Sequence, residues 1–266
     1  MASISALTIV MAVLMCLAGG KRGIAAFGSV ALNFILMFIA IILISAGFAP
    51  IWVALFVGIA ILAITIYLGN DDEQTARIAF IATLIVLCVM IVLIVPLDHF
   101  AQIKGFSNEQ TDEIEQFTLL VGVNFESITI ATTLLSTLGA ISEAAIAIAS
   151  GLREVIEQNP GISVAAVRRS GRNIGFQIMG MTFNTLFFGM FGGDLALFVL
   201  LYKLKATFGY YLNSKIFVSE CMMVLYSAIA VILVIWITTQ MMARKVKWAA
   251  HQEKPGEQQG SNVHPD

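Results

Sequence analysis

Residues 78–97 read IAFIATLIVLCVMIVLIVPL, a run with no charged side chain. A helix needs about 20 mostly apolar residues to cross about 30 Å of lipid hydrocarbon, and this run is long enough. Only helices and closed barrels satisfy their backbone hydrogen bonds inside a bilayer, and the strands of a barrel would alternate apolar and polar residues. The continuous run therefore predicts a membrane-spanning α-helix.

Six other runs resemble this one, and one of them is more polar than the rest. Five apolar runs lie at about 2–18, 24–46, 50–68, 173–192 and 218–242. The more polar run, at about 118–138, contains Asn124 and Glu126. We therefore expect an all-α, polytopic bundle of about seven transmembrane helices over residues 1–247. Residues 248–266 lack the apolar side chains for a core, so we expect a polar, disordered tail.

The composition excludes the soluble classes of protein. Apolar residues make up 59% of the chain and charged residues 12%, whereas soluble domains carry about 25% charged residues. The net charge of −2 gives no electrostatic footprint for nucleic acid. The three cysteines lie inside apolar runs, which argues against a disulfide framework and against a zinc site. No His-Glu-x-x-His, Gly-x-Ser-x-Gly or phosphate-binding glycine motif occurs, so we expect no enzyme, metal or cofactor.

Lysine and arginine predict the orientation, because they favour the cytoplasmic side of a membrane. Three groups of basic residues fall on one side of a seven-span arrangement. They are Lys21 and Arg22, then Arg153, Arg168, Arg169 and Arg172, and finally Arg244, Lys245 and Lys247. Placing them inside puts the N-terminus outside the cell and the C-terminus in the cytoplasm. Lys203 and Lys205 then fall outside, which opposes this orientation.

Two segments do not fit simple spans. Residues 138–159 contain a glycine at which we expect a helix break, Gly139, and they either extend the fifth helix or form a half-inserted helix that would make eight spans. Gly192 and Gly193 interrupt the sixth helix, and the apolar run that follows, to 204, is about ten residues long. A run that short predicts a re-entrant or interfacial segment.

Glu143 is the most informative single residue. A carboxylate at the centre of a bilayer costs about 2.5–3.5 kcal/mol on insertion scales, and such residues often mark an ion or proton path. Alternatively, Glu143 lies near the cytoplasmic headgroups, where water hydrates it. We expect an intramembrane polar pathway that contains Glu143 together with Ser150, Asn184, Thr185 and Asp194.

The other candidate residues have structural interpretations as well. The amide of Asn184, which lies midway along the sixth helix, can hydrogen-bond to a neighbouring helix. Asp194 follows two glycines and can cap a helix instead of facing a pathway. A cytoplasmic cluster of arginines either sets the topology or binds an anionic headgroup or substrate. Its members are Arg153, Arg168, Arg169 and Arg172.

Several of these segments together resemble the YibE/F family of bacterial membrane proteins. They are 138–150 (LGAISEAAIAIAS), 169–175 (RSGRNIG), 178–180 (IMG), 184–186 (NTL) and 192–193 (GG). The combined motif is specific, and the resemblance covers about residues 19–240. The family commonly has aspartate where this chain has Glu143, which keeps the acid with a longer reach, and serine where it has Ala147.

The resemblance implies a location, a partner and a class of function. The chain resembles the shorter form of the family, which lacks an extracytoplasmic N-terminal region and tends to occur with a longer form. This implies a multi-pass protein of the bacterial cytoplasmic membrane that forms a hetero-oligomer with a longer YibE/F-type protein. Two hypotheses follow: a transporter or channel component of unknown substrate, or a non-transporting subunit that stabilises or regulates that partner.

Overall fold

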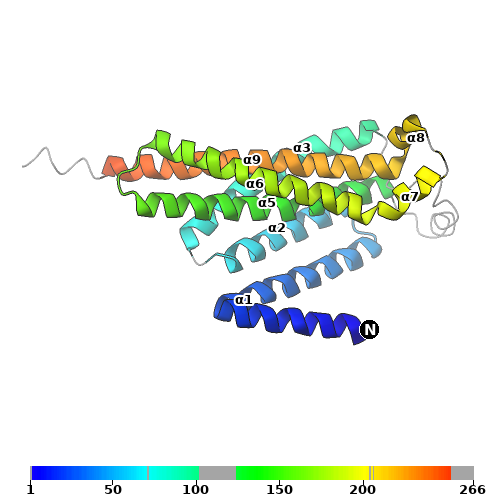
Figure 1. Cartoon of the computed structure of the whole chain (residues 1–266), viewed down its shortest axis with the longest axis horizontal. Coiled ribbons are helices and arrows are strands. Elements are labelled where there is room, and N and C mark those ends of the chain that lie inside the picture. The colour runs from blue at the N-terminus through cyan, green and yellow to red at the C-terminus, as the bar shows by residue number, and fades with distance from the viewer. Residues whose placement is uncertain (1, 71, 102–123, 204, 206, 253–266) are drawn as a thin grey trace, which may run out of the picture.

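The computed structural model describes residues 2–70, 72–101, 124–203, 205 and 207–252. Within these residues every regular element is an α-helix, as predicted (Figure 1). The helices are α1 (Ala2–Ser45), α2 (Pro50–Leu68), α3 (Glu73–Ala101), α5 (Phe125–Gln158), α6 (Val164–Gly193), α7 (Leu195–Lys203), α8 (Phe208–Asn213) and α9 (Lys215–Gln252).

Helix α1 turns back on itself at Gly20. This residue has φ 54° and ψ −129°, a backbone conformation that glycine adopts far more readily than residues with a Cβ atom. The two arms, residues 2–19 and 21–45, form a helical hairpin (Figure 1). At the turn, Gly23 packs so closely on Met15 that a Cβ atom would lie 1.8 Å from the Met15 carbonyl oxygen.

Six of the described helices are long and apolar enough to cross a membrane, namely α1, α2, α3, α5, α6 and α9. Each arm of α1 is long enough for a crossing of its own, since about 17 to 25 residues suffice. The structure therefore gives about seven spans, as the apolar runs predict. Of the more polar run at 118–138, residues 118–123 lie outside the described residues.

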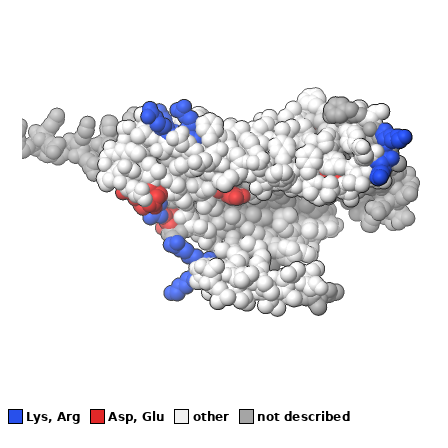
Figure 2. Space-filling model, viewed as in Figure 1, with Lys and Arg blue, Asp and Glu red and all other residues white. Residues whose placement is uncertain are grey.

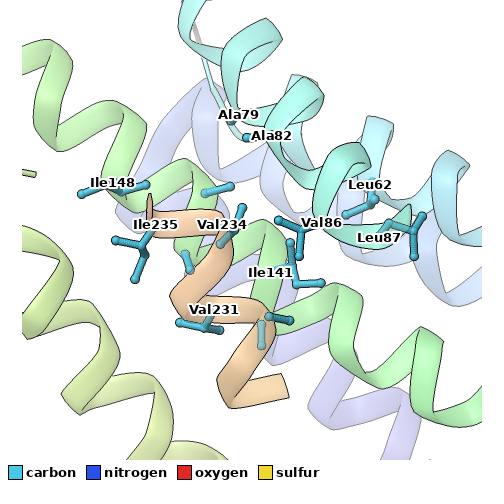
Figure 3. Packing of buried hydrophobic residues seen from close by; sticks show 14 of the residues in the cluster. Leu62, Ala79, Ala82, Val86, Leu87, Ile141, Ile148, Val231, Val234 and Ile235 are labelled. Carbon is cyan, nitrogen blue, oxygen red and sulfur yellow. The ribbon is translucent and has the colours of Figure 1, made fainter. Parts of the chain in front are cut away.

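Helix α5 is the central helix of the bundle. It packs against α2, α3, α6 and α9, whereas α1 packs against α2. Ile141 and Ile148 of α5 are completely buried, and Figure 3 shows them in one cluster with Val86 of α3 and Val234 of α9. Lipid tails are as apolar as these side chains, so van der Waals contact, and not the hydrophobic effect, stabilises such packing in a membrane.

Small residues bring α6 close to α9. A Cβ atom on Gly171 would lie 2.5 Å from Cγ2 of Thr239, and one on Gly175 would lie 2.6 Å from Cγ2 of Ile235. The two glycines are four residues apart, so they lie on the same face of α6. Small residues at this spacing are typical of closely packed membrane helices.

The connections between helices place the charged residues at the two ends of the bundle. In Figure 1 the turn of α1, the α2–α3 and α5–α6 connections and the end of α9 lie at the left, and the N-terminus, α7 and α8 lie at the right. Figure 2 shows Lys and Arg at both ends, and a middle that carries one acidic patch and is otherwise nearly uncharged. An uncharged middle fits a bilayer; which end faces the cytoplasm stays a prediction.

The segment 138–159 is a continuation of the fifth helix and not a separate span. The helix break predicted at Gly139 is wrong, because α5 passes through this residue without interruption. A glycine inside a helix costs about 1 kcal/mol relative to alanine, and the packing of neighbours such as Ile141 outweighs that cost. The break at Gly192 and Gly193 is confirmed, since α6 ends at Gly193.

Two further predictions concern the short apolar run after Gly193 and the start of the C-terminal tail. The nine residues of α7 are too few to cross a bilayer, as expected for the short run after the double glycine. Helix α9 continues to Gln252, so the first residues of the predicted tail belong to a helix. Residues 253–266 of that tail lie outside the described residues.

Candidate functional site

Glu143 lies near the middle of α5 on its exposed side. Its neighbours Ile141, Ala144 and Ala145 are fully buried against other helices, and they fix which way the helix faces. No hydrogen bond or ion pair joins the Glu143 carboxylate to another residue of the described chain. The acid is therefore held at the level of the apolar core, and the described helices around it supply no hydrogen bond or opposite charge to compensate it.

Glu143 belongs to a row of small and polar residues on the same exposed face of α5. Successive members are three or four residues apart, which places them on one side of an α-helix. This row, called the α5 track below, consists of Thr132, Ser136, Gly139, Glu143, Ala147 and Ser150, all of them exposed.

The α5 track lies between α2 and α6. On a helix with 3.6 residues per turn, Ile146 lies about 60° to one side of Glu143 and Gly151 about 80° to the other. Ile146 approaches Gly69 at the end of α2, and Gly151 approaches Ile174 of α6. The track is therefore bordered on both sides by neighbouring helices and is open outward.

One end of the track meets a cavity between α5, α6 and α9. The cavity has a volume of about 390 Å³, and Ser136 of the track lines it. Its other polar lining residues are Thr185, Asp194, Glu220 and Ser227. Asp194 is the C-cap of α6, where its backbone N–H donates to the carbonyl of Met190. Two carboxylates and three hydroxyls in one cavity offer only oxygen atoms as polar side-chain groups, which suits a cation.

The other end of the track meets a group of charged residues. Asn70 Nδ2 donates to Ser150 Oγ over 3.4 Å. Asp72 accepts hydrogen bonds from the backbone N–H and the hydroxyl of Thr75 at the start of α3, and it lies 3.5 Å from Arg153. The hydrogen bond from the Thr75 hydroxyl is the main cause that holds the pKa of Asp72 below its ordinary value, with the charge of Arg153 acting in the same direction.

The comparisons with known proteins identify the family. A model of YibE/F-like proteins matches residues 7–248, which is nearly the whole chain. The chain belongs to the YibE/F family. No curated protein and no solved structure matches it. Family membership and the apolar helices together make this YibE/F chain an integral membrane protein.

The YibE/F fold brings only some of the predicted pathway residues together. Glu143 and Ser150 lie on the α5 track, and Thr185 and Asp194 line the cavity at its end. Asn184 is exposed on α6 and does not line that cavity, although the adjacent Thr185 does. Neither Glu143 nor Asn184 lines the cavities described between α5, α6 and α9, so a pathway through both stays a prediction.

The four arginines of the predicted basic cluster divide between two helices of the YibE/F fold. Arg153, on α5, lies beside Asp72 and donates from Nε to Glu157 over 2.6 Å. Arg168, Arg169 and Arg172 lie in the first turns of α6. Arg168 and Arg172 line a cavity against α9, and Arg169 does not. In the described part of the chain, no three His, Cys, Asp or Glu side chains are grouped to hold a metal ion.

Sequence reasoning missed two acidic residues, one half-buried and one fully buried in the YibE/F fold. Glu220 lines the cavity beside Asp194, and Asp98 is 1% exposed at the end of α3. Tyr226 of α9 donates its hydroxyl to Asp98 Oδ1 over 2.8 Å. Both acids lie at the edges of apolar runs, where acids usually reach water. The tyrosine inside the last apolar run was a sequence signal for a buried polar partner.

Proposed function

We propose that this chain is a transporter or channel component that conducts a cation along the α5 track. The supporting observation is the position of Glu143, midway along a spanning helix and exposed. A carboxylate that faces hydrocarbon costs about 2.5–3.5 kcal/mol on insertion scales, so it needs water, a cation or another helix beside it. A conducting path supplies water and a cation.

The polar groups on either side of Glu143 support the same proposal. Ser136 connects the track to the cavity that holds Asp194 and Glu220, and Ser150 connects it to the charged end of α5. Acidic residues at the entrance and in the middle favour cations over anions, because the local field attracts the opposite charge. The substrate class we propose is therefore a small cation or a proton.

A second subunit closes the open side of the track in this proposal. Gly139 and Ala147 flank Glu143 on the exposed face, and small side chains let a neighbouring helix approach closely. The proposed partner is the longer YibE/F-type protein that the resemblance implies. Conduction and assembly would then use the same face of α5, with Glu143 shielded from lipid by the partner.

Cation flux tests this function directly. The chain is reconstituted with its longer partner in proteoliposomes, and uptake of rubidium and of protons is measured. We expect Glu143→Gln to abolish flux and Glu143→Asp to retain most of it, because aspartate keeps the charge. Glu73→Gln is the matched control, since Glu73 is an exposed acid in the first turn of α3 and is not a member of the α5 track. Flux that is unchanged by Glu143→Gln would sink the proposal.

The alternative function is a non-transporting subunit that stabilises or regulates the partner. The same exposed face supports it, because small residues around an acid also suit a helix–helix interface. The flux experiment separates the two functions. If Glu143→Gln co-purifies with the partner less well, and flux per assembled complex is unchanged, Glu143 serves assembly alone.

We also propose that the protein lies in the bacterial cytoplasmic membrane with its N-terminus outside. The end of the bundle with Arg153 and Arg168 carries most of the arginines, and this end would face the cytoplasm. Cysteines introduced at Ser3 and Ser163 test it with a membrane-impermeant maleimide. We expect labelling of Ser3→Cys in intact cells and of Ser163→Cys only after permeabilisation; the reverse pattern would invert the orientation.

A further inference from the structure

A second cavity lies between α6 and α9, away from the α5 track. Its volume is about 410 Å³, within the range of about 300–1,000 Å³ that is usual for small-ligand sites. Its polar lining comes from Arg168 and Arg172 of α6 and from Thr239 and Gln240 of α9. The two arginines are four residues apart, so both point to the same side of α6.

The polar groups of this cavity have no hydrogen-bond partners among the residues that the structure describes. Neither arginine forms a hydrogen bond or ion pair with another residue in the described part of the chain. Thr239 is only 6% exposed, and its Oγ1 atom is buried without a hydrogen-bond partner among those residues. A buried hydroxyl without a partner is unfavourable, so two free guanidinium groups beside such a hydroxyl indicate a missing ligand.

The ligand that fits these groups is an anion with apolar chains attached. Guanidinium groups bind phosphate oxygens through paired hydrogen bonds, and a hydroxyl adds a further donor. The cavity also has an apolar side: Phe176 is 64% exposed and Trp236 is 61% exposed, and both line it. In a membrane these side chains face lipid tails, and tryptophan favours the level of the headgroups.

We propose that this cavity binds the phosphate headgroup of an anionic phospholipid. Arg168 and Arg172 hold the phosphate, Thr239 and Gln240 donate to its oxygens, and the acyl chains lie along Phe176 and Trp236. Basic pockets between transmembrane helices are suited to such headgroups. The shared chemistry is a phosphate anion, and the exposed aromatic side assigns the source to a lipid and not to free phosphate.

Lipid binding to the full chain in a neutral detergent tests the site. Native mass spectrometry and thermal unfolding are recorded with added phosphatidylglycerol, phosphatidylcholine or sodium phosphate. We expect phosphatidylglycerol to bind and to raise the unfolding temperature, and the other two additives to do neither. Arg168→Gln and Arg172→Gln should each weaken phosphatidylglycerol binding about fivefold, the effect of removing one basic group near a membrane surface.

Two further variants distinguish binding in the cavity from a general effect of surface charge. Arg169→Gln removes a neighbouring exposed arginine that does not line the cavity, so binding should be unchanged. Thr239→Val keeps the shape of the side chain and should weaken binding about two- to tenfold. An equal loss in Arg169→Gln would overturn the site in favour of diffuse surface charge. Full stabilisation by sodium phosphate would overturn the lipid, and unaltered binding in both Arg168→Gln and Arg172→Gln would overturn the whole proposal.

Discussion

Replacing Gly171 by alanine is the sharpest test of how α6 meets α9. The new Cβ atom would lie 2.5 Å from Cγ2 and 2.7 Å from Oγ1 of Thr239. Carbon atoms pack best at about 3.5–4.0 Å, so one helix must move by about 1 Å. Thr239 has a short, branched side chain on a packed helix and has no flexible end that can move away.

The expected magnitude follows from two opposing effects. Overpacking a well-packed interface costs about 1–3 kcal/mol. Alanine in place of glycine inside a helix gains about 1 kcal/mol. Gly180→Ala supplies the matched control, because Gly180 is on the same helix with no atom within 4 Å of its added Cβ. Gly171→Ala should therefore be less stable than Gly180→Ala by about 1–3 kcal/mol.

Unfolding in mixed micelles, followed by circular dichroism, measures this difference. Adding Thr239→Ala removes the two atoms that the new methyl group would meet most closely and leaves only Cβ at 3.2 Å, so the double variant should recover most of the loss. This cycle isolates the contact itself, because each single change is measured separately. Equal stability of Gly171→Ala and Gly180→Ala would refute the close approach of α6 and α9.

Two other predictions concern single hydrogen bonds. Tyr226→Phe leaves the buried Asp98 carboxylate without its donor at 2.8 Å, so unfolding in the same micelles should show a loss of about 1–3 kcal/mol; no loss would mean that Asp98 has another partner. The pKa of Asp72 is lowered in the folded protein, chiefly by Thr75, so its contribution to stability is present at neutral pH and is lost as the pH falls below about 4. Asp72→Asn should reduce the loss of unfolding free energy at acidic pH. An unaltered pH dependence would show that Asp72 does not cause this loss.

The sequence predicted the spanning helices well, because hydropathy alone decides where a chain enters a bilayer. The length of α5 was harder to predict. Glu143 and a series of alanines lower the hydropathy of its second half, so the sequence left open a separate segment after Gly139. Tertiary packing decides the matter: α5 is surrounded by four helices, and its continuity depends on contacts that have no local signal in the sequence.

The sites were less predictable, because they depend on which side of a helix a residue occupies. Arg168, Arg169 and Arg172 look alike in the sequence, but only the first and last line the cavity against α9. Glu220 and Asp98 lie near the ends of apolar runs, where hydropathy predicts contact with water. The burial of Asp98 and the partial burial of Glu220 arise from the arrangement of α9 beside α3 and α6, which no local pattern records.

The central position of α5 limits how the proposed pathway can open and close. A helix packed against four neighbours cannot shift without disturbing α2, α3, α6 and α9 together, so the track that contains Glu143 is a fixed element. Helix α7 is less enclosed than α5: it packs on α6, and its Phe198 ring contacts Phe217 of α9. It begins beside Asp194 at the cavity where the track ends. If the track conducts, gating therefore belongs to the entrance near α7 or to the partner that covers Glu143, and an engineered cross-link between α5 and α9 should leave conduction intact.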